Sequence, residues 1–493
     1  MSWSIRIGVR LLSALGIAMT GCSSPGPFDG SISDLMLRDF GSVSASERAL
    51  IERASGGAFE PWVSDVELPA DASAADFVRL ALDRNPTLRA ARQRVLRLQQ
   101  RIPQVESLAD PMLQIAPFGQ MAETAAGQVS VMTGISQRIP YPGKLAARGR
   151  IAGQDVAIAE QELERLRLSV VSDTRTAYWS LYYAARAIEV TRQSRDLLVQ
   201  MREVVRAKYR VGAATQESVL RTAVALNNLE NELITLDQRR TTAVAMLNSL
   251  IDRSVTADLA DPRPIELSEF DLRLDDLLST ARLASPMIGV IRERMQRFLE
   301  QRELARLNRY PDLTVGLSYN LVDDQGLSPV ANGDDQWWIG FGINLPIWQP
   351  RLKAAELEAM RGILETAGLV AGEQNRVAFR VQDAYAKVET HQRQVILLRD
   401  VIVPEARQTV EASLSGYRAG SVDYLSLIDN WRKLLDFQLM YQRSLADLER
   451  AFAELQEAVG RDVPRRRILD DADEPRDNDT ESPEPDGGAE NDR

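Results

Sequence analysis

Two stretches in the second half of the chain alternate between apolar residues and small or polar ones. Residues 313–321 carry Leu, Val, Leu, Tyr and Leu at the odd positions, with Thr, Gly, Ser and Asn between them. Residues 337–345 alternate Trp, Ile, Phe, Ile and Leu with Trp, Gly, Gly and Asn. This period of two predicts two β-strands that each have two different faces. Their length matches one tilted crossing of a lipid bilayer.

The first half of the chain repeats this pattern less clearly. Residues 129–139 alternate in the same way, whereas Pro117 interrupts the partner stretch at 112–118. One face of these strands is apolar and the other carries Thr, Ser, Asn and Gly. Such strands suit the wall of a membrane channel, with the apolar face toward lipid and the polar face toward a water-filled lumen. Trp337 and Trp338 suit an aromatic girdle at the membrane boundary. The alternative is a soluble β-hairpin on a core, whose outer face would carry more charge.

Long helical stretches follow each pair of predicted strands. Residues 145–208 contain no proline, and residues 353–417 contain only Pro404. At about 1.5 Å per residue the first stretch would be on the order of 95 Å long. Helices of this length imply coiled-coil packing, and we expect an interruption at Pro404.

The two halves of the chain share one plan. Four features recur at offsets of 200 to 208 residues: Asn85-Pro86 and Ser285-Pro286, Ile139-Pro140 and Leu345-Pro346, Tyr178 and Tyr385, and Tyr209-Arg210-Val211-Gly212 and Tyr417-Arg418-Ala419-Gly420. Each half therefore predicts a helix, two strands, a long helix, a tight turn and a second long helix. A glycine at the turn has a physical reason, because a reversal between helices needs a positive φ at one residue.

The N-terminus is typical of a bacterial lipoprotein signal. Arg6 and Arg10 precede an apolar stretch, residues 11–19, that is too short to span a bilayer as a helix. It ends at Met19-Thr20-Gly21-Cys22, and Cys22 is the only cysteine. We therefore expect cleavage before Cys22 and lipid on its sulfur, the alternative being an ordinary export signal.

These signals divide the chain into five segments. We expect a signal peptide at 1–21, an irregular arm at 22–72, a first repeat at 73–262, a second repeat at 263–462 and a disordered acidic tail at 463–493. The net charge is −11. Residues 470–493 hold eleven acidic residues and two arginines, so most of the negative charge lies in the tail.

Composition argues against an enzyme and against nucleic-acid binding. One cysteine and one histidine, His391, exclude a His/Cys zinc site within one chain. His391 lies in a polar helical stretch and has no nucleophile signature beside it. The chain before the acidic tail is not basic enough to bind nucleic acid. We expect no cofactor and no resident metal.

The arrangement resembles the TolC family of outer-membrane factors. Ile139-Pro140-Tyr141-Pro142-Gly143-Lys144 looks like that family's strand-to-helix junction, with Pro-Gly-Lys common in its heavy-metal efflux branch, and Leu345-Pro346 is the matching point in the second repeat. The turns at Tyr209–Gly212 and Tyr417–Gly420 look like the tips of its periplasmic hairpins. The resemblance covers about residues 74–462.

The resemblance implies a fold, partners and a location. Four strands are too few to close a barrel, so three chains would share a twelve-stranded β-barrel above an α-helical barrel. The chain would be mainly α-helical and would lie in the outer membrane with its helices in the periplasm. It would form a homotrimer, contact outer membrane lipid, and dock on a periplasmic adaptor and an inner-membrane pump, expected to be of the RND type.

The family also implies a charged gate at the second tip. Relatives carry two acidic residues three apart on the following helix, and here those positions are Ser426 and Asp429. The basic residue expected after the turn glycine is replaced by Val422, while Asp423 lies nearby. We therefore expect Asp429, with Asp423, to form the periplasmic gate.

Three functions remain open from the sequence. The first is a passive efflux channel for drugs or heavy-metal ions. The second is the outer membrane channel of a type I protein secretion system. The third is a periplasmic coiled-coil structural lipoprotein without a pore, which the strand alternation disfavours.

Overall fold

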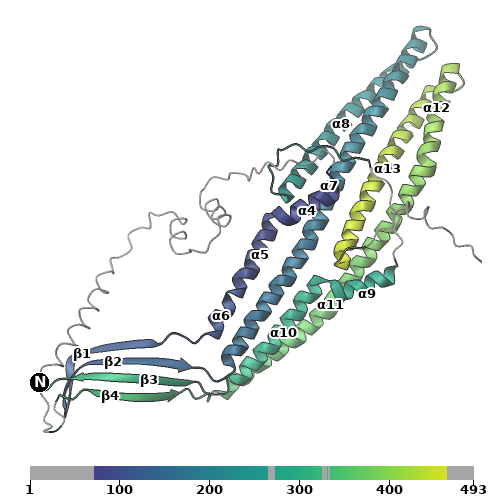
Figure 1. The fold of residues 1–493 in the computed structure, drawn as a ribbon. Helices are drawn as coiled ribbons and strands as arrows, with labels where there is room; N and C mark the ends of the chain where they lie inside the picture. The colour runs from purple at the N-terminus through teal and green to yellow at the C-terminus, as the bar shows by residue number, and fades with distance from the viewer. Residues whose placement is uncertain (1–71, 265–272, 325–329, 331–332, 464–493) are drawn as a thin grey trace, which may run out of the picture. The chain divides into compact units, whose positions relative to one another are not determined.

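The computed structural model describes residues 72–264, 273–324, 330 and 333–463. Cys22, the predicted arm as far as residue 71 and the predicted tail from residue 464 lie outside the described residues. The described part contains one four-stranded sheet and two sets of helices, and each half of the chain contributes two strands and one set (Figure 1). The predicted tandem repeat is therefore confirmed.

The sheet consists of β1 (Met112–Thr124), β2 (Gly127–Ile139), β3 (Leu313–Val322) and β4 (Gln336–Ile343), all antiparallel and in chain order. The first strand is longer than predicted, because the sheet continues past Pro117 after a register shift. Pro117 lacks a backbone N–H. An edge strand tolerates a proline because the backbone on its outer side has no neighbouring strand to which it could donate a hydrogen bond. The fourth strand ends at Ile343 rather than at residue 345.

The register confirms the two predicted faces of the sheet. Residues paired across neighbouring strands lie on the same face. Leu317 of β3 pairs with Ile135 of β2 and with Ile339 of β4, whereas Gly316 pairs with Ser136 and Gly340. We call the first set of rows the apolar face and the second the polar face. The apolar face includes Leu313, Val315, Leu317, Tyr319, Leu321, Trp337, Ile339, Phe341 and Ile343, and the polar face includes Gly134, Ser136, Thr314, Gly316, Ser318, Asn320, Trp338, Gly340 and Gly342.

The two neighbouring tryptophans lie on opposite faces. Trp337 pairs with Tyr319 on the apolar face, but Trp338 pairs with Ser318 on the polar face. The interpretation of both indoles as one lipid-side girdle is therefore wrong for Trp338. Successive side chains of a strand point to opposite sides of the sheet, so only Trp337 can stand in the apolar face.

In the first repeat, the helix before the strands is divided into α4 (Ala74–Arg84), α5 (Pro86–Gln99) and α6 (Arg101–Glu106). The first break falls at Asn85, whose Oδ1 accepts hydrogen bonds from Thr87 N (3.0 Å) and Leu88 N (3.2 Å). Pro86 lacks an N–H and therefore begins a helix rather than continuing one. After the strands come α7 (Lys144–Arg210) and α8 (Gln216–Leu250).

The second repeat has the same order, with α9 (Leu274–Ala284) and α10 (Pro286–Leu307) before its strands. After the strands, α11 (Gln349–Leu397) passes through the π-helical segment η1 (Leu398–Ile402) into α12 (Val403–Ala419), and α13 (Tyr424–Val459) returns. The predicted interruption at Pro404 thus takes the form of a wider π turn just before the proline. Proline removes one helical hydrogen bond, which this turn accommodates.

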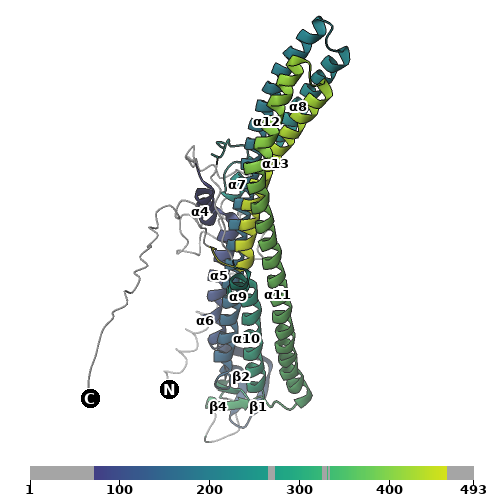
Figure 2. The same cartoon turned by 90° about the vertical axis from the view of Figure 1, so that its right-hand side faces the viewer.

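The helices of the two repeats pack side by side (Figures 1 and 2). Their largest core cluster joins α4, α5, α7, α8, α9, α10, α11 and α13. Its fully buried members include Tyr182, Leu247, Val381 and Phe452. Among the described helices, none is long and apolar enough to cross a membrane.

Candidate channel sites: the strand–helix junctions and the helical tips

The residues predicted at the first strand–helix junction lie between the end of β2 and the start of α7. Gly143 has φ 91° and immediately precedes α7. The backbone N–H of Lys144 donates to Tyr141 O at 3.1 Å, which closes a turn around Pro142. Pro140 follows the last residue of β2 directly. Two prolines and a left-handed glycine thus redirect the chain from an extended to a helical course within four residues.

The second junction is built differently. Pro346 lies between the end of β4 at Ile343 and the start of α11 at Gln349. Its carbonyl accepts a hydrogen bond from the Gln349 side chain at 2.9 Å. No glycine occupies the position that corresponds to Gly143. Instead α11 begins at Gln349-Pro350, with proline in its first turn.

One buried residue, Asp312, connects the junctions. Asp312 lies directly before β3 and is only 5% exposed. Its carboxylate forms ion pairs with Lys144 Nζ at 2.7 Å and with the Arg138 guanidinium at 2.6 Å. It also accepts the backbone N–H of Tyr141 at 3.0 Å. Lys144 is itself 3% exposed and donates a second hydrogen bond to Tyr310 O at 2.7 Å.

The electrostatics of this cluster favour the ionised carboxylate. Burial alone would raise the pKa of Asp312, but hydrogen bonds from Lys144, the Tyr141 backbone and Arg138 lower it to about 2. The Asp312 backbone N–H donates to Asn344 Oδ1 at 2.5 Å. Strand β2 and helix α7 therefore meet at the ionised carboxylate of Asp312, and the residue after β4 meets its backbone. We call these residues the junction cluster: Arg138, Tyr141, Lys144, Asp312 and Asn344.

No pattern in the sequence marks Asp312 as a functional residue. At the 200-residue offset of this region its counterpart in the first repeat is Met112, so repetition does not mark it. Lys144 stood within the predicted junction motif. Its partner lies 168 residues away along the chain, and only the three-dimensional arrangement brings the two together.

The two predicted tip turns have the same hydrogen-bond pattern. At the first, Gly212 N donates to Tyr209 O (3.0 Å) and Ala213 N to Lys208 O (2.8 Å). At the second, Gly420 N donates to Tyr417 O (3.2 Å) and Ser421 N to Gly416 O (2.9 Å). These bonds define the Schellman ending of a helix. The glycines have φ 76° and 86°, so the expected positive φ is present at both turns.

The tips of the two hairpins are joined by buried contacts. The hydroxyl groups of Thr222 on α8 and Tyr424 on α13 lie 2.8 Å apart. Thr222 is fully buried and Tyr424 is 7% exposed. Lys208 Nζ lies 4.8 Å from the ring centroid of Tyr417, a cation–π contact between the hairpins. Sequence repetition identified Tyr417 as a turn residue but did not identify Thr222 or Tyr424.

The predicted gate residues are exposed and lie at the start of α13. Asp429 forms an ion pair with Lys433 at 2.8 Å, one helical turn further on. Asp423 is the residue before α13, and hydrogen bonding with Ser426 lowers its pKa. Asp423 and Ser426 thus interact with each other, and Asp429 interacts with Lys433, which the family resemblance did not mark.

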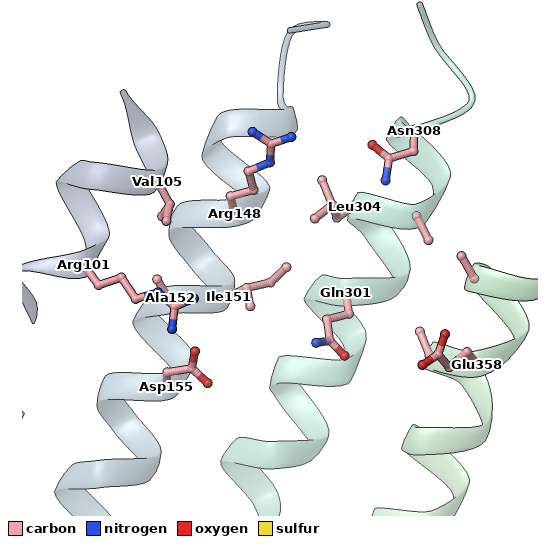
Figure 3. A pocket seen from close by; sticks show the side chains of 13 residues that line it. Arg101, Val105, Arg148, Ile151, Ala152, Asp155, Gln301, Leu304, Asn308 and Glu358 are labelled. Atoms are coloured by element: carbon pink, nitrogen blue, oxygen red, sulfur yellow. The ribbon is translucent and has the colours of Figure 1, made fainter. Parts of the chain in front are cut away.

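A hollow of about 500 Å³ crosses the helices near the junctions (Figure 3). It is lined by four helices and the residue that follows one of them: Arg101 and Val105 of α6, Arg148, Ile151, Ala152 and Asp155 of α7, Gln301, Leu304 and Ala305 of α10 with Asn308 directly after it, and Ala355, Glu358 and Ala359 of α11. Charged, amide and apolar groups alternate across it. Such a mixed lining is typical of a wetted helix surface rather than of a tight ligand pocket.

A family model described as outer membrane efflux protein matches residues 77–252 and 277–461. The chain belongs to the outer membrane efflux protein family. This efflux protein therefore lies in the outer membrane as a channel component, and it is not an enzyme. The family model matches once in each half of the chain, as the tandem repeat requires.

Two relatives and one solved structure illustrate the similarity. The efflux protein is 22% identical over 397 residues to the cobalt-zinc-cadmium resistance protein CzcC of Cupriavidus metallidurans, covering 78% of this chain and 88% of CzcC. It is 23% identical over 213 residues to toxin and drug export protein A of Aggregatibacter actinomycetemcomitans, covering 41% and 45%. Its fold resembles the outer membrane protein VceC of Vibrio cholerae with a TM-score of 0.65 at 19% identity, covering 79% and 96%.

Proposed function

We propose that three copies of this efflux protein form a passive conduit that receives solutes from an inner-membrane pump through a periplasmic adaptor. The four-stranded sheet carries this proposal. It has an apolar and a polar face, and in the described residues β1 and β4 are its edge strands. Closing a barrel around a lumen takes roughly eight strands or more. Three such sheets would pair edge to edge and leave no strand edge open.

The cargo we propose is a small solute, either a drug or a heavy-metal ion, exported by a pump of the RND type. Two observations support small solutes. The relative CzcC is named for resistance to cobalt, zinc and cadmium. Pro142-Gly143-Lys144 resembles a junction that is common in the heavy-metal branch of the family. A second candidate is export of proteins by a type I system, which the similarity to toxin and drug export protein A favours.

We also propose that Asp429 and Asp423 contribute to the closed end of this conduit. In a trimer, three copies of each carboxylate would surround the axis at the tips and attract cations. Lys433 offsets part of the charge of Asp429. The Thr222–Tyr424 contact would hold the second hairpin against the first in this closed arrangement.

Cross-linking tests the proposed edge pairing. In a Cys22→Ala background the chain has no cysteine, and the paired substitutions Leu113→Cys on β1 and Ile339→Cys on β4 mark the two edges. A bis-maleimide should produce a covalent trimer. The control pair Leu113→Cys and Leu317→Cys places one cysteine on the inner strand β3 and should produce far less. Equal yields, or a monomer in native mass spectrometry, would contradict the trimer.

Deletion of the gene then separates the two candidate cargos. Loss of an efflux conduit should raise sensitivity to zinc, cobalt, cadmium or hydrophobic dyes, while the secreted proteins stay unchanged. Loss of a type I channel should remove one or more proteins from the medium without changing metal sensitivity. Complementation with the wild-type chain should restore the affected property.

A further inference from the structure

Trp338 is the one large aromatic side chain that the register places on the polar face among the described residues of β2, β3 and β4. It lies in a row with Ser318 of β3 and Gly134 of β2, and the next position on its face along β4 is Gly340. A serine and two glycines therefore lie beside it on that face. Its neighbour Trp337 belongs to the apolar face and provides a natural comparison.

The indole of Trp338 is accessible and has room beside it. The side chain is 42% exposed. A Cβ added at Gly340 would meet nothing within 4 Å, so the space next to the ring is open. Within the part of the chain that the structure describes, the Trp338 side chain makes no hydrogen bond or ring contact. A tryptophan that packs for stability normally fills a core and satisfies its N–H, and Trp338 does neither here.

Trp338 lies toward the end of the sheet that is remote from the helices. Strand β4 begins at Gln336 and runs toward α11, so Trp338 is near its far end. The described residues at this end, 323–324 and 333–335, include four aspartates and no lysine or arginine. One of them, Asp335, accepts hydrogen bonds from Tyr319 OH at 2.5 Å and Val322 N at 3.0 Å. Tyr319 belongs to the apolar face, so Asp335 does not lie beside the indole of Trp338. The negative charge at this end of the sheet still favours cations over anions there.

We propose that Trp338 contacts cargo inside the lumen and binds organic cations through the face of its indole. The inference rests on the proposed trimer, in which the polar face lines the lumen and three copies of Trp338 stand at one level. A quaternary ammonium ion is weakly hydrated and is attracted to the negative face of an indole. A divalent metal ion retains its water molecules more strongly. The aspartates would attract both kinds of cation, but the indole distinguishes them.

Block of single-channel current tests this site. Wild-type trimers in a planar bilayer should be blocked by tetrabutylammonium, and Trp338→Leu should weaken the block by roughly threefold to tenfold. Trp338→Phe should retain part of it. The control Trp337→Leu, on the lipid side, should leave the block unchanged. Zinc ions should act equally on wild type and on Trp338→Leu.

Cysteine accessibility checks the face assignment separately. In the Cys22→Ala background, a charged, membrane-impermeant methanethiosulfonate reagent should reduce the conductance of Trp338→Cys and leave Trp337→Cys unaffected. Conducting trimers with the same tetrabutylammonium block in wild type and Trp338→Leu would overturn this inference alone. Absence of trimers and of conductance in the wild type would overturn the proposed conduit and, with it, this site.

Discussion

The ammonium group of Lys144 lies 2.7 Å from the carboxylate of Asp312, and both side chains are almost fully buried. Lys144 begins the long helix of the first repeat, whereas Asp312 precedes the first strand of the second. The pair therefore connects the repeats at the point where strands give way to helices. A contact at this point determines how the sheet and the long helices are joined.

Removing the charge of Asp312 should be costly. Asp312→Asn would leave Lys144 buried without its counterion, and breaking a buried pair from one side typically costs about 3–5 kcal/mol. We expect a large fall in the melting temperature of the purified protein. The comparison is Glu217→Gln, which breaks the exposed pair with Arg221 and should cost under about 1 kcal/mol. Similar melting temperatures for the two variants would contradict the role of the junction cluster.

The same group should make stability depend on acid pH. The pKa of Asp312 is about 2 in the folded protein against an ordinary 3.8. Its contribution, on the order of 2–3 kcal/mol, is complete above pH 5 and is lost as pH falls from about 4 through 2. Thermal unfolding should be measured at pH 7, 5 and 3. The difference in melting temperature between wild type and Asp312→Asn should narrow only at pH 3. A difference that is constant across this range would refute the prediction.

The two faces of the sheet should tolerate arginine differently. Phe341 lies on the apolar face and is 73% exposed, so Phe341→Arg should cost roughly 2–4 kcal/mol if that position is near mid-membrane. Gly340→Arg enters the polar face, where space is open. Heat-modifiable migration of the folded protein on a gel measures the outcome. Loss of folded protein in both variants, or in neither, would falsify the assignment of faces.

Cys22 should be the mature N-terminus and should carry lipid. The motivation is the signal pattern that ends at this residue, the only cysteine in the chain. Mass spectrometry of the membrane-extracted protein should find diacylglyceryl and acyl groups on Cys22. Cys22→Ala should lose this mass while keeping membrane association through the sheet. Cleavage elsewhere, or an unmodified thiol, would rule out lipidation.

The charge at the second tip should respond to both members of the Asp429–Lys433 pair. If three Asp429 carboxylates surround the axis, Asp429→Asn should reduce the block of conductance by a trivalent cation at low salt. Lys433→Gln removes the neutralising partner and should strengthen the same block. Unchanged block in both variants would mean that Asp429 does not line the pore, and Asp423→Asn would then be the next variant to measure.

Local patterns were sufficient to predict the strands, the repeats and the tip turns. Alternation is visible within nine residues, and a glycine with positive φ has its reason within the turn itself. The division of the tryptophans between faces was also contained in the alternation of residues 337–345. The alternation places Trp338 on the polar face, although the Trp337-Trp338 pair also suited an aromatic girdle.

Contacts between the repeats were not predictable in this way. Asp312 meets Lys144 across 168 residues, and Thr222 meets Tyr424 across 202. Neither pair recurs at the repeat offset, because these residues join one repeat to the other instead of serving the same purpose in each. A single sequence shows which residues resemble each other, but it does not show which dissimilar residues meet.

The π-helical segment η1 has a consequence for the far end of the second hairpin. Val381, Val388 and Val395 are buried at intervals of seven residues on α11, and Val410 and Tyr417 are buried seven apart on α12. Between Val395 and Val410 the interval is 15 residues, one more than two heptads. One additional residue turns a helix by about 100°, and the wider turn absorbs it. The extra residue therefore rotates the buried face of α12 relative to that of α11. As a result Tyr417 contacts Lys208 and Tyr424, in place of Gly416, which has no side chain. Deleting a single residue in η1 would rotate the tip out of register while leaving every residue of the tip unchanged.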